Sequence, residues 1–413
     1  MHTVRADQVL QRIEALAQFS DEPQGLCRIF CSPMAARANA LVLEWAAAAG
    51  LAGFVDNIGN VRIRRNDHDA ARPTFVIGSH LDSVRDAGKY DGPLGVLIGL
   101  AVLERLHAQQ PALPFNLEVV GFSDEEGVRY HTTYLGSSVL AGVFDPAWLE
   151  KRDAQGITLA AAIEAFGGRV DVLGNDAIPA QQFLGYYEVH IEQGPHLEAV
   201  DAPVGVVSGI AGQVRVALRF LGQAGHAGTV AMRHRYDALC AAADFIRKAE
   251  KYARRRENLV ATVGACEVRP NASNVIPGEV LLSLDVRSAD ATVLAEARRN
   301  LHNLARQVAE KRRLAMAWTL AQENPPLACD GPLSEWLSAS VQAAGFPLIH
   351  LPSGAGHDAV AIAKAAPVSM LFVRCRGGIS HHPDEYATPE DIAAALAVSD
   401  RFIDQLIQTY SPQ

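Results

Sequence analysis

The stretch TFVIGSHLDSVRDAGKYDGPLGVLIGLAVLERLHAQQPALPFNLEVVGFSDEE, residues 74–126, decides the fold. Thr74–His80 and Asn116–Glu126 at its two ends are apolar runs of strand length that stop at polar residues. Between them, Pro93–Gln109 has the length and composition of a helix, with proline in its first turn. A strand, a helix and a second strand in this order predict neighbouring parallel strands that are covered by a helix.

The same alternation of strands and helices runs through the first two hundred residues and returns near the end of the chain. Phe183–Ile191 and Pro367–Arg374 are further strand-like runs. The sequence therefore predicts an α/β fold, with a mainly parallel sheet covered by helices, over residues 1–205 and 323–413. Ligands of such sheets collect at the carboxyl ends of the strands.

A different pattern occupies residues 206–322. Val214–Gly222 and Val280–Arg287 alternate between apolar and polar residues, which predicts strands with one covered face. Long helical stretches, about 235–256 and 292–312, follow these two strands in turn. We therefore predict an inserted α+β domain.

Composition limits the classes of function. Of the 413 residues, 49% are hydrophobic, which is enough for a large core and two domains. The formal charge of −9, without a long basic run, argues against nucleic acid or an anionic membrane as a partner. Six cysteines without a CxxC pair, and an amino terminus without an export signal, predict a cytoplasmic protein.

Polar residues suited to metal binding follow several of the predicted strands. None is a cysteine, so the available ligands are imidazole and carboxylate, which suit a catalytic divalent metal site better than a closed structural one. The candidates are His80, Asp91, Glu125, Glu126, His190 and His381.

Each candidate has an ordinary structural explanation when it is taken alone. His80 and Asp82 are either a metal ligand with the carboxylate that orients it, or a paired histidine and aspartate at a strand end. Asp91 before Gly92 is either a bridging ligand or a turn aspartate. Glu125 and Glu126 repel each other unless a cation or a proton compensates, or they lie in a solvated loop.

The two remaining histidine candidates also have more than one interpretation. His190 is either a ligand or a core histidine, and His382 competes with His381 as a ligand. Taken together, two histidines with a bridging carboxylate, plus a second carboxylate and a third histidine, would hold two metal ions. Such a site keeps a net positive charge, which lowers the pKa of a bound water and attracts an anionic substrate.

The chain resembles the amidase/hydantoinase/carbamoylase family over nearly its whole length, from Asp56 to the last helix. This family comprises N-carbamoyl-L-amino-acid hydrolases and allantoate amidohydrolases, which are related to dinuclear zinc carboxypeptidases and aminoacylases. The motifs that carry the resemblance are GSHLDSV, KYDGPLGV, SDEEGVRY, HIEQGP, GHAGT, RPNASNVIPG with LDVR, SGAGHDA and GISHHPDE.

The resemblance implies roles for the strand-end residues. One metal would be held by His80, Asp91 and His190, and the other by Asp91, Glu126 and His381. Asp91 would bridge the two ions, and Glu125 would be the general base and acid. His381 is preferred to His382 because Ser380–Glu385 matches the family pattern Ser-His-x-Pro-x-Glu.

The resemblance also makes the insert a dimerisation domain. His226 of GHAG would reach the active site of the partner subunit and stabilise the oxyanion, while Asn274 and Arg287 would bind the substrate carboxylate. Gln193 and the loop that ends at Gly356 are further substrate-side candidates. Without the resemblance, Arg287 would be a surface charge on a strand and Asn274 a turn residue.

Two departures from the family pattern are noted. Val230-Ala231 stands where members often have Thr-Pro, next to the His226 motif, and Pro93 follows the glycine after Asp91. Pro93 suits a helix start, whereas Val230-Ala231 bears on substrate choice.

The function implied is a homodimeric enzyme that uses two divalent ions, zinc or else manganese, cobalt or nickel, to hydrolyse a C–N bond of an N-carbamoyl-L-amino acid or a related ureido or amide acid. Alternatives are an allantoate amidohydrolase, and an aminoacylase or dipeptidase with the same metal core. A non-catalytic binding module is the alternative of a different class, and it is disfavoured because every expected ligand position is filled. HExxH, GxSxG and GxxxxGK[ST] are absent from the sequence.

Overall fold

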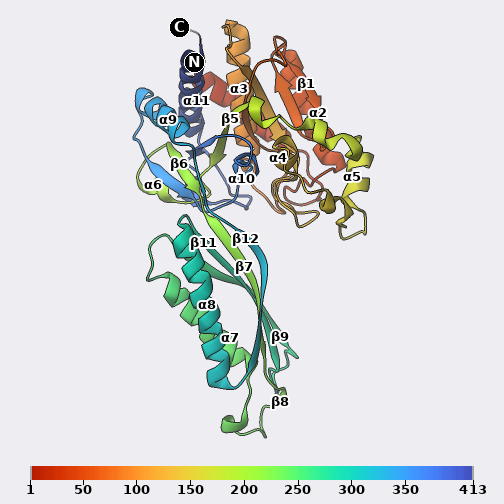
Figure 1. The fold of residues 1–413 in the computed structure, drawn as a ribbon, viewed down its shortest axis with the longest axis vertical. Coiled ribbons are helices and arrows are strands. Elements are labelled where there is room, and N and C mark those ends of the chain that lie inside the picture. Colours follow the sequence, from red (N-terminus) through yellow and green to blue (C-terminus); the bar gives the residue numbers. More distant parts are fainter. Residues whose placement is uncertain (1, 412–413) are drawn as a thin grey trace. The chain divides into compact units, whose positions relative to one another are not determined.

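A computed structural model describes residues 2–411, which divide into two compact units. Unit 1 comprises the chain up to Ser208, Cys329–Leu351 and the chain from Gly356 onward. Unit 2 comprises Gly209–Ala328 and Pro352–Ala355. Figure 1 shows the elements of both units in sequence colours.

Unit 1 is built on a large mixed sheet whose strand order is β1-β2-β4-β3-β5-β15-β6, with β14 beside β6. The sheet ends in β13, which pairs with the last residues of β6, and these paired residues belong to unit 2. The central strands β4, β3, β5 and β15 are parallel, as the sequence predicts, and the flanking pairs are antiparallel. The strands are β1 (Ala52–Val55), β2 (Val61–Arg64), β3 (Thr74–His80), β4 (Asn116–Phe122), β5 (Phe183–Ile191), β6 (Val204–Ile210), β13 (Leu327–Ala328), β14 (His350–Ser353) and β15 (Val368–Val373).

Every residue of β3, β4 and β15 is buried, as expected for parallel strands that are covered on both faces. The long helices α1, α3, α9 and α11 share one hydrophobic cluster with these strands. The helices of unit 1 are α1 (His2–Leu16), α2 (Pro33–Ala48), α3 (Pro93–Gln109), α4 (Leu135–Leu140), α5 (Leu159–Phe166), α6 (His196–Ala199), α9 (Gly331–Ala343), α10 (Ala359–Ile362) and α11 (Pro389–Tyr410).

Unit 2 is a four-stranded antiparallel sheet, in the order β12-β7-β11-β9, with a separate two-stranded ribbon of β8 and β10. The inward residues of β7 and β11 are buried against α7 and α8, which lie on one side of the sheet (Figure 1). Its elements are β7 (Gly212–Leu221), β8 (Gly225–His226), α7 (Ala238–Ala253), β9 (Val260–Arg269), β10 (Val275–Ile276), β11 (Glu279–Ser288), α8 (Ala291–Arg312) and β12 (Ala315–Asn324). The predicted α/β class is confirmed.

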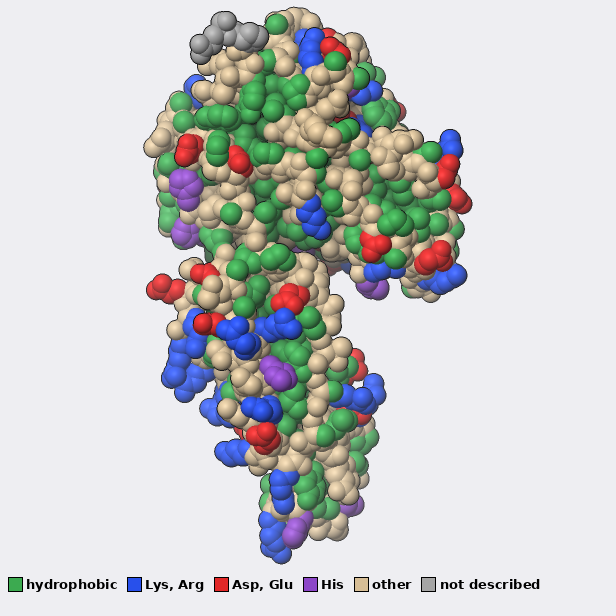
Figure 2. All heavy atoms as spheres, viewed as in Figure 1, with side chains coloured by type: hydrophobic (Ala, Val, Ile, Leu, Met, Phe, Trp, Pro, Cys, Tyr) green, Lys and Arg blue, Asp and Glu red, His purple; other side chains and the backbone are tan. Residues whose placement is uncertain are grey.

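Charge is divided unevenly between the two units. Unit 2 has 18 Lys and Arg against 11 Asp and Glu, whereas the rest of the chain has 19 against 35. Figure 2 shows many Lys and Arg side chains on the drawn face of unit 2. Unit 2 is therefore basic although the chain as a whole is acidic.

None of the helices in residues 2–411 combines the length and the apolar character that crossing a bilayer requires.

Candidate metal centre and active site

Four neighbouring parallel strands deliver the strand-end residues to one edge of the sheet of unit 1. His80 is the last residue of β3, and His190 lies one residue before the end of β5. Glu125 and Glu126 follow β4, and His381 follows β15 after a short turn. Because β4, β3, β5 and β15 are adjacent in the sheet, their carboxyl ends bring these side chains together.

Asp91 lies at the centre of this group and faces two sets of residues. Its Oδ1 is 3.3 Å from Nε2 of His80 and 2.9 Å from Nε2 of His190. Its Oδ2 is 3.1 Å from Nε2 of His381, and that nitrogen is 3.6 Å from Oε1 of Glu126. One carboxylate thus presents a different oxygen to each set, as a ligand shared by two cations would.

Three overlapping groups of potential ligands meet the distance requirement of a metal site. In each group, the ligand atoms lie within 4.8 Å of one another. The groups are His80, Asp91 and His190; His80, Glu125 and Glu126; and Asp91, Glu126 and His381. The predicted ligands are therefore brought together, although their roles as ligands stay a prediction.

The ligand histidines are oriented through their other ring nitrogen. Nδ1 of His80 is 3.0 Å from the Asp82 carbonyl oxygen, and Nδ1 of His190 is 2.9 Å from the Ile191 carbonyl oxygen. An imidazole that donates Nδ1–H to a carbonyl has its lone pair on Nε2. Both Nε2 atoms face Asp91, so the two rings are ready to bind a cation there.

Asp82 fixes the backbone of Glu125 and Glu126, in addition to its position beside His80. Its Oδ1 accepts the backbone N–H of Glu125 at 3.0 Å, and its Oδ2 accepts that of Glu126 at 3.1 Å. Asp82 is buried, so these bonds are shielded from water. The side chain therefore shapes the turn that carries Glu125, in addition to the predicted contact with His80.

Burial and like charge raise the pKa of both glutamates. The pKa of Glu126 rises to about 7, first through burial and then through the charge of Asp91. Burial, and then the neighbouring Glu126 charge, raise the pKa of Glu125 well above its usual range. A carboxylate whose proton affinity is raised in this way is suited to accept a proton from water near neutral pH.

The protonation of Asp91 is controlled by the three histidines. Burial alone would raise its pKa, but His190, His381 and His80 hold the pKa well below its ordinary range. The same contacts raise the pKa of His80 against the effect of burial, through Asp82 and Asp91. This concentration of mutually interacting ligand groups fits a divalent cation, which would replace the shared protons.

Sequence reasoning missed part of the hydrogen-bonded layer around Asp91. Oε1 of Glu385 accepts the backbone N–H groups of Tyr90 and Asp91, at 2.8 and 3.0 Å. The Ser380 hydroxyl is 3.1 Å from Oδ2 of Asp91 and 2.9 Å from Oε2 of Glu385. Both residues lie in the GISHHPDE motif, whose sequence pattern distinguishes His381 from His382 but does not indicate contacts with Asp91.

Gln193 lies against the metal centre. Its Nε2 donates to Oδ2 of Asp91 at 2.8 Å and is 3.2 Å from the Ser380 hydroxyl. The backbone of Gln193 has φ of +55°, in the left-handed region. The proposed substrate contact of Gln193 stays a prediction, but in this structure its amide positions the shared carboxylate.

Gly356 is packed against Tyr134 of the same unit. A Cβ at this position would lie 1.9 Å from the Tyr134 hydroxyl. Glycine therefore has a steric reason to be here, independent of any contact with substrate.

His226 and Asn274 lie together on the ribbon of unit 2. His226 is paired with Val275 in the ribbon, and the Ala227 N–H donates to the Asn274 carbonyl at 2.9 Å. The Gly228 N–H donates to Nδ1 of the exposed His226 ring at 3.0 Å. A neutral ring held in this way carries its proton on Nε2, which makes Nε2 a hydrogen-bond donor.

Arg287 lies at the opposite end of unit 2 from His226 and Asn274. It is near the end of β11, whereas the ribbon adjoins the beginning of that strand, at a distance of roughly 25 Å along an extended chain. Its Nε is 2.9 Å from Oδ1 of Asp285, and its Nη1 donates to the Gly354 carbonyl at 2.8 Å. Within one chain, Arg287 therefore cannot act on the same small molecule as Asn274.

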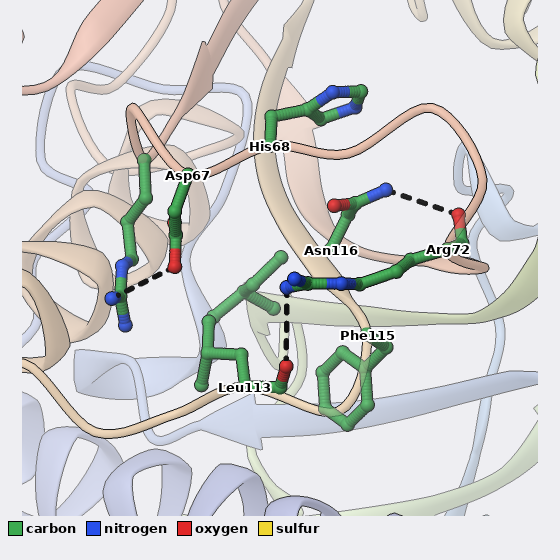
Figure 3. Close-up of a pocket in the computed structure, with 8 residues that line it drawn as sticks. Asp67, His68, Arg72, Leu113, Phe115 and Asn116 are labelled. Carbon is green, nitrogen blue, oxygen red and sulfur yellow. Dashed lines mark hydrogen bonds and ion pairs between the residues drawn. The ribbon is translucent and has the colours of Figure 1, made fainter.

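A small hollow in unit 1 lies at the other end of the parallel strands, away from the metal centre. It has a volume of about 10 Å³, which holds at most one water molecule. Figure 3 shows that Arg72 donates to the Leu113 carbonyl and Asn116 to the Arg72 carbonyl. Both bonds are internal to the protein, so this hollow is no substrate site.

Gly92 is expected to be essential for the geometry of His80. Its φ is +83°, and a Cβ there would lie 2.5 Å from two atoms of the His80 ring. We expect Gly92→Ala to weaken metal binding by at least about tenfold, measured by competition with a chromogenic chelator. The matched control is Gly156→Ala, because Gly156 has a similar φ of +79° with open space around it. Equal metal affinity in the two variants would contradict this prediction.

Removal of metal is expected to make stability sensitive to pH. The folded-state pKa values of Glu125, Glu126 and His80 are raised, so the metal-free fold loses stability as pH rises through these values. We expect the metal-free protein to be less stable at pH 8 than at pH 6 by on the order of 2 kcal/mol in denaturant unfolding. Metal-loaded protein should lack this loss, because the cations stabilise the ionised carboxylates. A metal-free protein that is more stable at pH 8 would contradict the argument.

The chain was compared with known proteins. The sequence profile of the peptidase family M20/M25/M40 matches residues 76–405. An allantoate deiminase of Arabidopsis thaliana is 38% identical, over 97% of this chain and 82% of that protein. An N-carbamoyl-L-amino acid amidohydrolase of Geobacillus stearothermophilus is 36% identical, over 98% of this chain and 99% of that protein. The crystal structure of an amidase of the hydantoinase/carbamoylase family from Burkholderia multivorans has a TM-score of 0.88 and 34% identity, over 96% of this chain and 97% of that one. This chain therefore belongs to the peptidase family M20/M25/M40, the members of which include amidohydrolases that cleave C–N bonds outside peptides.

Proposed function

We propose that this protein hydrolyses a C–N bond of an N-carbamoyl-L-amino acid or a related ureido acid, with release of ammonia and carbon dioxide. The observation that carries the proposal is the position of Asp91, with Oδ1 against His80 and His190 and Oδ2 against His381. The names of the relatives from Geobacillus stearothermophilus and Arabidopsis thaliana support the substrate class.

The donor set fits two divalent ions. His80, Asp91 and His190 would hold one, and Asp91, Glu126 and His381 the other. Bound there, the ions would supply an activated water and Lewis-acid polarisation of the substrate carbonyl. Nitrogen and oxygen donors suit zinc, and also manganese, cobalt or nickel.

Glu125 is the group that we assign to proton transfer. It is buried, it stands next to Glu126, and Asp82 fixes its backbone. A carboxylate in this position can take a proton from the attacking water and deliver it to the leaving nitrogen. Glu125 is left for this work because Glu126 is the glutamate that faces His381.

His226 and Asn274 are assigned to the active site of a partner subunit in a homodimer. The Nε2–H of His226 would donate to the carbonyl oxygen of the substrate as negative charge develops on it. Asn274 lies beside His226 on the ribbon, so it would arrive from the same partner. The contrast between basic unit 2 and the acidic remainder of the chain supports the docking of unit 2 on unit 1 of a second copy.

Arg287 is assigned to the substrate carboxylate. Asp285 accepts from Nε and Nη2, and the Gly354 carbonyl accepts from Nη1, which leaves one N–H on each terminal nitrogen for a carboxylate. Because Arg287 lies far from the ribbon, the arginine and the histidine that serve one substrate molecule would come from different subunits.

Two further properties complete the proposal. An allantoate substrate is the second candidate, and the 38% identity to the Arabidopsis thaliana allantoate deiminase favours it. A cytoplasmic location is inferred from the six cysteines, all of which are unpaired.

The test is an assay of ammonia release by metal-reconstituted protein. The panel contains N-carbamoyl-L-amino acids, allantoate, ureidoglycolate and N-acetyl amino acids, and the control is the same protein after chelation. Ammonia from the carbamoyl compounds supports the proposal, and ammonia from allantoate alone supports the second candidate. Activity confined to the acetyl compounds would overturn both.

A further inference from the structure

The loop that follows His226 is held by one arginine at its far end. Arg235 donates from Nη2 to the Ala227 carbonyl at 2.6 Å and from Nε to the Val230 carbonyl at 3.0 Å. We propose that Arg235 is a positioning residue, which keeps the His226 imidazole in the form that donates from Nε2. This inference rests on the proposed role of His226.

The orientation of the ring depends on the loop. The Gly228 N–H that bonds to Nδ1 of His226 lies between the two carbonyls that Arg235 holds. The Val230 N–H also donates back to the His226 carbonyl, at 3.2 Å. If the loop moved, Nδ1 would lose its donor, and the ring could exchange to the tautomer with its proton on Nδ1.

The guanidinium is well suited to this work. It is planar and rigid, so two of its N–H groups can fix the relative positions of two carbonyls, which a lysine ammonium on a flexible stem does less well. Arg235 is half-buried, which strengthens these bonds relative to those of a surface arginine.

The contacts of Arg235 are made with the loop that carries His226. Its Nε and Nη2 both donate to backbone carbonyls of that loop. Arg235 therefore acts through His226.

Arg313 provides a matched comparison in the same unit. Its Nη2 donates to the Arg233 carbonyl at 3.0 Å, and its guanidinium lies 4.9 Å from the centre of the Tyr236 ring. Arg313 thus contacts the later part of the loop 227–237, at Arg233 and Tyr236, whereas Arg235 bonds to Ala227 and Val230 in its earlier part. Replacement of Arg313 removes the same charge and leaves the Gly228–His226 bond in place.

The experiment is a double-mutant cycle on the full-length, metal-loaded enzyme, with substrate from the panel above. We expect His226→Ala to lower kcat by about 10²–10³-fold and Arg235→Ala by about tenfold, with KM within about twofold. Arg235→Lys should fall between Arg235→Ala and wild type, and Arg313→Ala should stay within about twofold of wild type. The double variant, His226→Ala with Arg235→Ala, should be no slower than His226→Ala alone.

A second measurement separates positioning from general damage to the fold. The nitrogen chemical shifts of the His226 ring report its tautomer, and Arg235→Ala should reduce the fraction with the proton on Nε2, whereas Arg313→Ala should not. The inference is overturned if Arg235→Ala slows the His226→Ala enzyme by the full tenfold factor, if the Arg313 and Arg235 variants lose equal activity, or if the tautomer is unchanged. If His226→Ala itself has wild-type kcat, the proposed role of His226 falls, and this inference falls with it.

Discussion

Replacement of Glu125 by glutamine is expected to lower kcat by about 10²–10⁴-fold. Glutamine keeps the size of the side chain and the backbone N–H that donates to Asp82, but its amide cannot accept a proton from water. Because Glu125 is not assigned as a metal ligand, the variant should bind the same amount of metal as the wild type. KM should change little, since the loss is confined to the chemical step.

The control for this variant is its metal content, measured by elemental analysis after gel filtration. Glu126→Gln should behave differently, because Glu126 faces His381 and would lose metal as well as activity. Full turnover by metal-loaded Glu125→Gln would contradict the assignment of the base. Loss of metal by Glu125→Gln would show that this residue is a ligand.

Replacement of Arg287 by alanine is expected to raise KM by about 10²-fold for substrates that carry a carboxylate. The variant removes the guanidinium that we assign to the substrate carboxylate, together with its contact with Asp285. It also leaves Asp285 with one cation fewer, which adds repulsion toward an anionic substrate. The pKa of Asp285 is held below its usual range by Arg287 and Arg215, although burial opposes them.

Arg215→Ala is the matched control, because Nε of Arg215 bonds to the same Asp285 at 2.9 Å. Its side chain is 50% exposed, and it is not assigned to the substrate. Steady-state kinetics should show KM for Arg215→Ala within a few fold of wild type. An unchanged KM for Arg287→Ala would remove the carboxylate anchor from the mechanism.

The parallel part of the fold was predictable because strands that are buried on both faces consist mainly of consecutive apolar residues. Thr74–His80 and Phe183–Ile191 are strand-like runs, and the structure has strands with these bounds. The run predicted at Asn116–Glu126 is a strand only as far as Phe122, and the polar residues after it lie outside the strand. Pro93 marks the first residue of α3, as the missing N–H of proline allows at that position. The long helix expected at 235–256 is shorter, Ala238–Ala253, because the Asp237 side chain accepts the Cys240 N–H and caps the helix there.

The site was predictable only in part. Residues at strand ends can be placed on one edge from topology, which is why His80, Glu126 and His190 were found. The position of Glu385 could not be predicted in this way, because it does not directly follow a strand and its contact with Asp91 joins residues 294 positions apart in the chain. The sequence also does not show that Arg287 lies far from His226 and Asn274, because all three belong to one inserted segment. The distance becomes clear only from the structure, in which β11 separates Arg287 from the ribbon.

The central claim is that Glu125 of one subunit and His226 of its partner act on the same substrate. The most direct measurement is the activity of hybrids formed by mixing Glu125→Gln and His226→Ala subunits, each almost inactive alone. A hybrid dimer would have one site with both groups intact, so random mixing should restore roughly a quarter of wild-type activity. If His226 instead served its own subunit, each site in the hybrid would lack one group, and the mixture would stay as inactive as its components.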